Sequence, residues 1–311
     1  MSRSLAALYL IAAMALTGAN VPFGKAIVAE IPVYVFLVLR FAVATAVLAC
    51  LLGREPGPSL TRMSRTDLRD LALLSGLGSI AFTVFLMEGI KRTSAVDAGI
   101  ILATLPIATA LLGGLLRGER PRAGQTAAIV CAVAGLAIVN TTAGSGDRDA
   151  SALGNLLVCG AVACEAIFVL VSSRMSAVYR PVRLSFAVSG LSLAASLPLA
   201  IPQIAGTDFA AILPGIWLLA TWYALAASVF CTVLWYRGVA HVETWFAGLA
   251  TAAIPVVALA VAATVYAEPV GVAGLAGAAL VILAIALGTR STGRAPQARD
   301  RAASWWRKSR R

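Results

Sequence analysis

The sequence predicts an all-α integral membrane protein with ten transmembrane helices, arranged as two inverted five-helix repeats. Three observations predict this class: an apolar composition, recurring apolar runs of membrane-spanning length, and an internal duplication. Of the 311 residues, 60% are hydrophobic and 13% are charged, and the mean hydropathy is +0.89. Soluble domains have about 45–50% apolar and about 25% charged residues. The composition therefore excludes an ordinary soluble protein.

Apolar runs of about 20 residues, the length that crosses the hydrocarbon core as a helix, alternate with short polar breaks. We expect ten spans, at about 5–27, 33–52, 68–90, 95–116, 122–140, 152–173, 183–201, 212–236, 243–266 and 270–289. Turn-forming residues mark the breaks, among them Glu30-Ile31-Pro32 and Gly144-Ser145-Gly146-Asp147. The first run is longer than the apolar core of a signal peptide, so we interpret it as an uncleaved helix.

The duplication is clearest where Gly89–Glu119 recurs as Gly238–Glu268, at a shift of 149 positions. Without a gap, the shift maps Gly89, Ala98, Gly99, Ala103, Pro106 and Glu119 onto Gly238, Ala247, Gly248, Ala252, Pro255 and Glu268. We expect repeats at 5–140 and 152–289 and a basic tail at 290–311. Five spans per repeat is an odd number, so the second copy should be inverted, as in many secondary transporters.

The basic residues predict the orientation. With the N-terminus in the cytoplasm, the inner segments carry twenty Lys and Arg residues and the outer loops carry three. We therefore expect both termini on the cytoplasmic side of a bacterial inner membrane. The net charge of +11 reflects the same bias, and we expect the tail to contact anionic lipid rather than nucleic acid.

Short motifs recur along nearly the whole chain, from about residue 5 to residue 289. They are Gly18–Lys25 (GANVPFGK), Pro32, Leu39-Arg40-Phe41, Thr93-Ser94-Ala95, Leu105-Pro106, Gly118-Glu119-Arg120, Gln125, Ile254-Pro255, Ala267-Glu268 and the glycines Gly271, Gly274 and Gly277. Together this set resembles the EamA-type drug/metabolite transporters. The resemblance implies ten helices in two inverted repeats around a central cavity, moving small metabolites, often outward. Thr17 and Cys164-Glu165 stand where the family often has tryptophan-containing motifs near the cavity. The identity of the substrate is therefore the property that the resemblance predicts least.

Two charged residues lie inside predicted helices. Arg40 is seven positions into the span that begins at Val33, roughly 10 Å deep at about 1.5 Å per residue, and Glu165 is near the middle of the sixth span. A charge at such depth costs about 2.5–3.5 kcal/mol on insertion scales, so it should face the bundle interior. Arg40 is either a structural clamp or the ligand of a substrate carboxylate or phosphate. Glu165 is the first candidate for proton linkage or for holding a substrate amine, with a packing hydrogen bond as the alternative.

Three further residues are candidate substrate ligands. Asn20 lies in the first span, where a polar contact between helices is the alternative role. Trp222 and Tyr223 lie deep in the eighth span and are suited to line a cavity. Trp235 and Tyr236 lie near the inner end of that span, where aromatic residues anchor a helix at the membrane interface.

Pro106 and Pro255 occupy equivalent positions in the middle of two predicted spans. A proline there frees a backbone carbonyl, which only protein or a water-filled cavity can satisfy at that depth. We expect the pair to form hinges in the transport pathway, with simple packing bends as the alternative. Glu119 and Glu268 each precede a proline closely and are expected to cap the next helix rather than couple an ion.

The motifs of enzymes are missing from the sequence. It has no HExxH, GxSG or P-loop pattern, and its cysteines, Cys50, Cys131, Cys159, Cys164 and Cys231, lie in apolar runs without CxxC spacing. We therefore expect no catalytic residue, metal or cofactor. The sequence predicts a secondary transporter that exports small metabolites, such as amino acids, by alternating access. A non-transporting membrane scaffold is the alternative, and an intramembrane enzyme is less favoured. The oligomeric state stays open, a homodimer included.

Overall fold

The computed structural model describes residues 1–55, 60, 63–90, 92, 101–102, 104–118, 122–142, 152–265 and 271–291. The first half contains α1 (Arg3–Glu30), α2 (Val33–Leu52), α3 (Arg65–Ser75), the π-helix η2 (Gly76–Ala81), α4 (Phe82–Ile90), α6 (Leu105–Arg117) and α7 (Ala123–Thr142). The second half contains α8 (Ala152–Val178), α9 (Pro181–Ala205), α10 (Pro214–Leu225), the π-helix η3 (Ala226–Phe230), α11 (Cys231–Val239), α12 (Thr244–Ala250), α13 (Ala253–Val265) and α14 (Val272–Ser291). Most of the basic tail lies outside the described residues, as do Glu119 and Glu268.

The helices have the length and composition of membrane spans. Within the described ranges, seven helical segments are long and apolar enough to cross a membrane, and two shorter apolar helices, Leu105–Leu116 and Ala123–Ile138, accompany them. The all-helical membrane class predicted from composition is thus confirmed. The number of ten crossings stays a prediction.

The duplication extends to the boundaries of the elements. The shift of 149 positions carries α4 onto α11 and α7 onto α14, so that the first and last positions of each pair coincide. It also carries η2 onto the position of η3, so the third span of each half is interrupted by a π-helix at the same place. Such π-helical turns frequently lie at functional sites. The two halves therefore repeat each other in local structure as well as in sequence.

A threonine just after each π-helix forms the same hydrogen bond to the π-helix backbone. The hydroxyl group of Thr83 donates a 2.7 Å hydrogen bond to the carbonyl of Ser79, four residues earlier. The hydroxyl group of Thr232 donates a bond of the same 2.7 Å length to the carbonyl of Ser228. A carbonyl at the widened turn can lack its normal helical partner, and a nearby hydroxyl can satisfy it. In both halves, a threonine hydroxyl therefore satisfies a carbonyl group of the π-helix.

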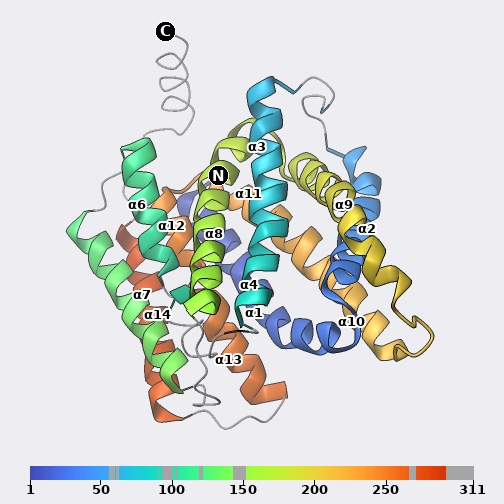
Figure 1. Ribbon diagram of the computed structural model, residues 1–311. Helices are drawn as coiled ribbons and strands as arrows, with labels where there is room; N and C mark the ends of the chain where they lie inside the picture. The colour runs from blue at the N-terminus through green and yellow to red at the C-terminus, as the bar shows by residue number, and fades with distance from the viewer. Residues whose placement is uncertain are drawn as a thin grey trace.

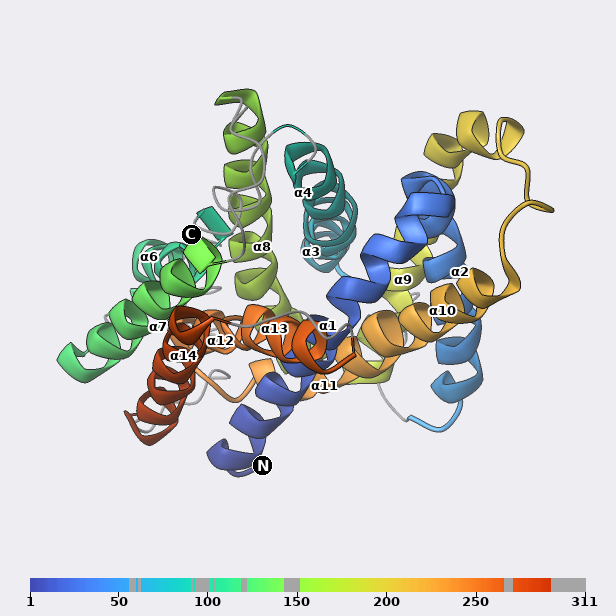
Figure 2. The ribbon, with the colours of Figure 1, turned by 90° about the horizontal axis from the view of Figure 1, so that it is seen from below.

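The two halves are interleaved. α1 packs against α11 and α13 of the second half, and α8 packs against α4 and α6 of the first. α2 pairs with α9 and α7 pairs with α14. The α7–α14 and α2–α9 pairs lie at opposite sides of the molecule, with α1, α8 and α11 between them (Figures 1 and 2). Each half therefore covers most of its apolar surface with the other half.

Helices α2 and α9 also satisfy each other's first turns. The backbone N–H of Tyr34 donates a 3.0 Å hydrogen bond to Oε1 of Gln203, near the end of α9. The backbone N–H of Arg183 donates a 3.1 Å bond to Oε2 of Glu55, just beyond the end of α2. First-turn amides have no partner within their own helix, so each needs an outside acceptor. Arg183 lies 149 positions beyond Tyr34, which makes the two caps counterparts.

Pro106 and Pro255 lie in the first turns of helices, which corrects their predicted position in the middle of continuous spans; their role as hinges stays a prediction. In the ninth predicted span the helix ends at Ala250 and resumes at Ala253, which places Pro255 in the first turn of α13. Pro106 is the second residue of α6 and follows a turn at Thr104. A first-turn amide makes no bond within its helix, so a proline there removes none. Both prolines begin a half-helix.

Glycines allow other helices to approach these half-helices closely. A Cβ atom on Gly18 of α1 would collide with the backbone carbonyl oxygen of Ile254, at the start of α13. A Cβ atom on Gly248 of α12 would collide with the side chain of Thr109 in α6. Only glycine permits such contacts without displacing the neighbour. The start of α13 is therefore packed against protein rather than against lipid.

Trp235 and Tyr236 lie in the protein core, which corrects their predicted place at the membrane interface. Their exposed fractions are 2% and 1%. Phe168 of α8 lies 6.1 Å from the Trp235 ring and 6.3 Å from the Tyr236 ring, between centroids. The indole N–H of Trp235 donates a 3.1 Å hydrogen bond to the hydroxyl of Ser172. These aromatic side chains join α11 to α8.

Candidate functional site

Arg40 extends from α2 towards η3. Its Nε atom donates a 2.6 Å hydrogen bond to Oγ of Ser228. The guanidinium carbon lies 5.2 Å from the ring centroid of Phe41 and 5.7 Å from that of Tyr223, within cation–π distance. No carboxylate in the described part of the chain forms an ion pair with it. A hydroxyl and two rings thus hold the cation, and its remaining N–H groups can bind an anionic ligand.

Glu165 lies near the middle of α8 and is half-buried. Its carboxyl group has no hydrogen-bond or ion-pair partner among the side chains that the structure describes. It lies within electrostatic range of the Tyr236 hydroxyl, which is buried and also has no partner among the described residues. A carboxyl group at this depth must be protonated, paired with a ligand or in contact with water.

The thiol of Cys231 lies within electrostatic range of both Arg40 and Glu165. Its Sγ atom is 3.0 Å from Oγ1 of Thr17 in α1. The Thr17 hydroxyl also bonds to the carbonyl of Ala13 at 3.1 Å, so its one proton is used there and the thiol is the donor. Helices α1, α2, α8 and α11 therefore bring a cation, a carboxyl group and a thiol into one central region.

Asn20 is buried in α1, with 1% of its surface exposed. Its Nδ2 atom donates a 2.8 Å hydrogen bond to the carbonyl of Leu16 in the same helix. Its Oδ1 atom is buried and accepts no hydrogen bond from the described residues. The contact between helices that the sequence left open for Asn20 is therefore not formed there. An amide oxygen in this state is suited to accept a bond from a ligand or from water.

The two aromatic candidates of the eighth span point in different directions. The Tyr223 ring lies edge-on to Phe36, 5.2 Å between centroids, and contributes to the cation–π contact with Arg40. The neighbouring Trp222 is 47% exposed. Tyr223 therefore belongs with Arg40, and Trp222 lies away from the central charged groups.

Sequence reasoning gave no role in this region to Ser228, Cys231 or Tyr236. It placed Thr17 near the cavity but did not foresee its contact with the Cys231 thiol. A signal existed for Ser228, because the shift of 149 positions maps Ser79 onto it within the duplicated π-helix. None existed for Cys231, whose place within electrostatic range of two charges follows from the packing of α11 against α1, α8 and α9. Within the described residues, no cluster of three His, Cys, Asp or Glu side chains is arranged to hold a metal ion.

Known proteins resemble this chain over most of its length. The model of the EamA-like transporter family matches it twice, at residues 4–141 and 152–290. "Uncharacterized transporter YetK" of Bacillus subtilis (strain 168) is 33% identical over 277 residues, covering 88% of this chain and 83% of that protein. An "Uncharacterized transporter" of Archaeoglobus fulgidus is 26% identical, with coverages of 79% and 85%. A solved structure, described only as "Crystal structure of protein", shares the fold with a TM-score of 0.77, 21% identity and coverages of 94% and 98%.

The two family matches divide the chain into the same halves that the repeated elements define. Together they cover nearly every described residue, and the apolar helices are those of a multi-pass membrane protein. The resemblance stated from the motifs is confirmed: the chain belongs to the EamA-like transporter family.

Proposed function

We propose that the protein is a secondary transporter that exports small metabolites, such as amino acids or related compounds, across the cytoplasmic membrane by alternating access. One observation carries the proposal. Arg40 and Glu165 lie within apolar helices, both within electrostatic range of Cys231, and form no ion pair with each other in the described structure. A protein that needs only to assemble has no reason to retain two such costly groups.

The two charges define complementary roles. Arg40 binds a carboxylate, and Ser228 and Tyr223 hold its guanidinium in place. Glu165 either binds the substrate ammonium or carries a proton that moves with the transport cycle. The free Oδ1 atom of Asn20 adds a neutral acceptor. Groups of opposite charge in one region favour a zwitterionic substrate.

In many transporters that work by alternating access, the second repeat is inverted relative to the first. The exchanged packing of α1 and α8 and the reciprocal caps of α2 and α9 support this arrangement. Pro106 and Pro255 begin half-helices at equivalent places, and discontinuous helices of this kind form substrate sites in other transporters. We assign the gating role to these breaks.

Counterflow of labelled amino acids in proteoliposomes tests the proposal. Arg40→Ala should raise the apparent KM for carboxylate substrates by about tenfold or more, because one charge-assisted hydrogen bond is lost. Arg40→Lys should restore binding only in part, because the planar fork is absent. Trp222→Ala is the matched control and should transport normally, because Trp222 is exposed and lies away from the central charged groups.

Glu165→Gln separates the two roles of the carboxyl group. If Glu165 carries a proton, the pH dependence of uptake should flatten in the variant. If it binds an ammonium group, the preference between amino acids and compounds without an amine should disappear. A folded wild-type protein that shows no counterflow of any tested metabolite would favour the membrane-scaffold alternative.

A further inference from the structure

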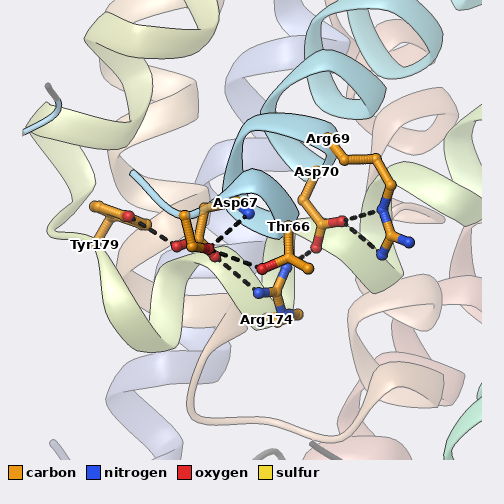
Figure 3. Close-up of polar contacts among 7 residues, drawn as sticks. Thr66, Asp67, Arg69, Asp70, Arg174 and Tyr179 are labelled. Carbon is orange, nitrogen blue, oxygen red and sulfur yellow. Dashed lines mark hydrogen bonds and ion pairs between the residues drawn. The ribbon is translucent and has the colours of Figure 1, made fainter. Parts of the chain in front are cut away.

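A cluster of four ionic or polar side chains ties α3 to α8 at one end of the molecule (Figure 3). Nη2 of Arg174 lies 2.8 Å from Oδ1 of Asp67, and Nη1 forms an ion pair with Oδ2 of Asp70. The hydroxyl of Tyr179 donates a 3.0 Å hydrogen bond to Oδ2 of Asp67. We call Asp67, Asp70, Arg174 and Tyr179 the Arg174 cluster. One guanidinium thus bridges two carboxylates from the other half of the chain.

The Arg174 cluster is more than a solvated surface pair. The side chains of Asp67, Asp70 and Arg174 are 13%, 5% and 18% exposed. Burial, followed by the hydrogen bond to Asp67, raises the pKa of Tyr179 to about 12, so its hydroxyl remains a donor at physiological pH. Charges this shielded from solvent are weakly screened by salt and interact strongly. The cluster is therefore a firm link between the halves.

The duplication provides a comparison at the opposite end of the molecule. The shift of 149 positions places Ile216 where Asp67 stands and Leu219 where Asp70 stands. Both lie in α10, and both pack on an apolar cluster that includes Ile27 and Ile31, at and just beyond the end of α1. The pair α1 and α10 is the counterpart of the pair α8 and α3. Equivalent helices are thus joined by ions at the Arg174 end. At the end near Glu30 they are joined mainly by apolar side chains, beside one exposed 3.4 Å hydrogen bond from the Leu213 N–H to Oε2 of Glu30.

We propose that the Arg174 cluster is an ionic latch that closes the Arg174 end of the transport pathway, while the apolar contact of α1 with α10 closes the other end. The inference rests on the proposed alternating access, in which equivalent contacts must part in turn. Parting α1 from α10 exposes apolar surface to water. Parting α3 from α8 exposes charges, which water then solvates. Separation of α1 from α10 is therefore opposed by apolar burial, and separation of the equivalent pair α8 and α3 is opposed by ionic contacts.

The thiol of Cys231, in the central region, can report which end is open. In a variant that keeps Cys231 and replaces the other four cysteines by alanine, a charged, membrane-impermeant methanethiosulfonate reagent is applied to inside-out and right-side-out vesicles. Arg174→Gln should speed labelling from the face at the Arg174 end by about tenfold. This factor corresponds to the free energy of one strong charge-assisted hydrogen bond. Labelling from the opposite face should slow or stay unchanged.

Arg69→Gln is the matched control. Arg69 also binds Asp70, with Nη2 at 3.1 Å from Oδ1, but its side chain is 66% exposed and it lies on α3 itself. Its loss leaves the link to α8 in place, so labelling should match that of the parent. Equal acceleration by Arg69→Gln and Arg174→Gln would overturn the latch, because a general loosening of α3 would explain both.

Arg174→Gln removes the cation that Asp67 and Asp70 share. It leaves only Tyr179 on Asp67 and Arg69 on Asp70, and this loss can prevent folding. The triple variant Asp67→Asn, Asp70→Asn, Arg174→Gln removes every charge of the latch together and should fold. Unchanged labelling in this folded variant would overturn the proposal. Accelerated labelling in a protein that shows no counterflow would keep the latch and reject the transport function, and unchanged labelling with normal counterflow would do the reverse.

Discussion

At the residue scale, neither of the two charged side chains in the apolar helices has an oppositely charged partner among the described residues. Arg40 is bound by a serine hydroxyl and aromatic rings, and the described residues provide Glu165 with no bonded partner. The duplicated serines of the π-helices have diverged in role. Ser228 binds Arg40 from another helix, whereas Ser79 donates a 3.3 Å bond to the carbonyl of Leu74 in its own half. Equivalent residues thus bind the Arg40 side chain in one repeat and the backbone in the other.

This divergence provides a paired prediction. Ser228→Ala should raise the KM for a carboxylate substrate about threefold to tenfold with little change in folded yield, because Arg40 loses the bond that directs it. Ser79→Ala, the equivalent change in the other repeat, should leave KM unaltered. Ser228→Thr, which keeps the hydroxyl, should recover most of the affinity. Equal effects of the two alanine variants on transport would show that the π-helices matter but Arg40 does not.

The sequence predicted the identity of the costly residues but not what surrounds them. The depth of Arg40 and Glu165 followed from counting along apolar runs, because charge in lipid is penalised whatever the fold. The separation of Trp222 from Tyr223 did not follow, because adjacent helical residues differ by about 100° in direction and only packing decides which faces inward. Trp235 was misplaced for the same reason: an aromatic residue near a helix end suits the interface or the core equally.

Breaks and widened turns are the features that stand out at the element scale. The third span of each half carries a π-helix, and the half-helices α6 and α13 begin at equivalent positions with a proline in the first turn. The sequence indicated both prolines but suggested kinks, because a proline within a long apolar run gives no sign that the helix has already ended. The π-helices left no signal in composition.

The contact of α1 with the start of α13 should tolerate no added atom. Gly18→Ala should lower the free energy of unfolding by about 1–3 kcal/mol, because the new Cβ atom meets a backbone carbonyl that cannot rotate away. Gly215→Ala is the control, since no heavy atom lies within 4 Å of its Cβ position. Thermal unfolding in detergent, followed by size-exclusion chromatography, measures both. A Gly18→Ala melting curve that overlays the control would contradict the close approach.

The arrangement of the whole molecule depends on exchange between its halves. Each half matches the family separately, yet the main packing partners of α1, α2, α7 and α8 lie in the opposite half. The sequence foresaw the repeat because identical residues recur at one spacing. Nothing in the sequence indicated that the helices of one half pack on those of the other. The spacing of residues shows which segments are repeated but not which helices are in contact.

Topology is tested at the same scale. A reporter that is active only outside the cytoplasm should be active when fused after Gly146 and inactive when fused after Arg311, because basic residues are retained on the cytoplasmic side. A matched pair of fusions to a cytoplasm-active reporter should give the opposite pattern. Activity of the first reporter at Arg311 would invalidate both the orientation and the even number of crossings.

The exchanged packing also bears on how the chain is made. A ribosome completes α1 and α2 well before α11, α13 and α9, the helices that later cover them. Until then lipid surrounds the first half, and Arg40 lies in the bilayer before Ser228 has been synthesised. The early helices must therefore remain in the membrane as separate spans, able to slide and rotate, until the late ones insert among them. Because α7 packs mainly on α14, the last helix described, assembly is complete only when that helix has inserted.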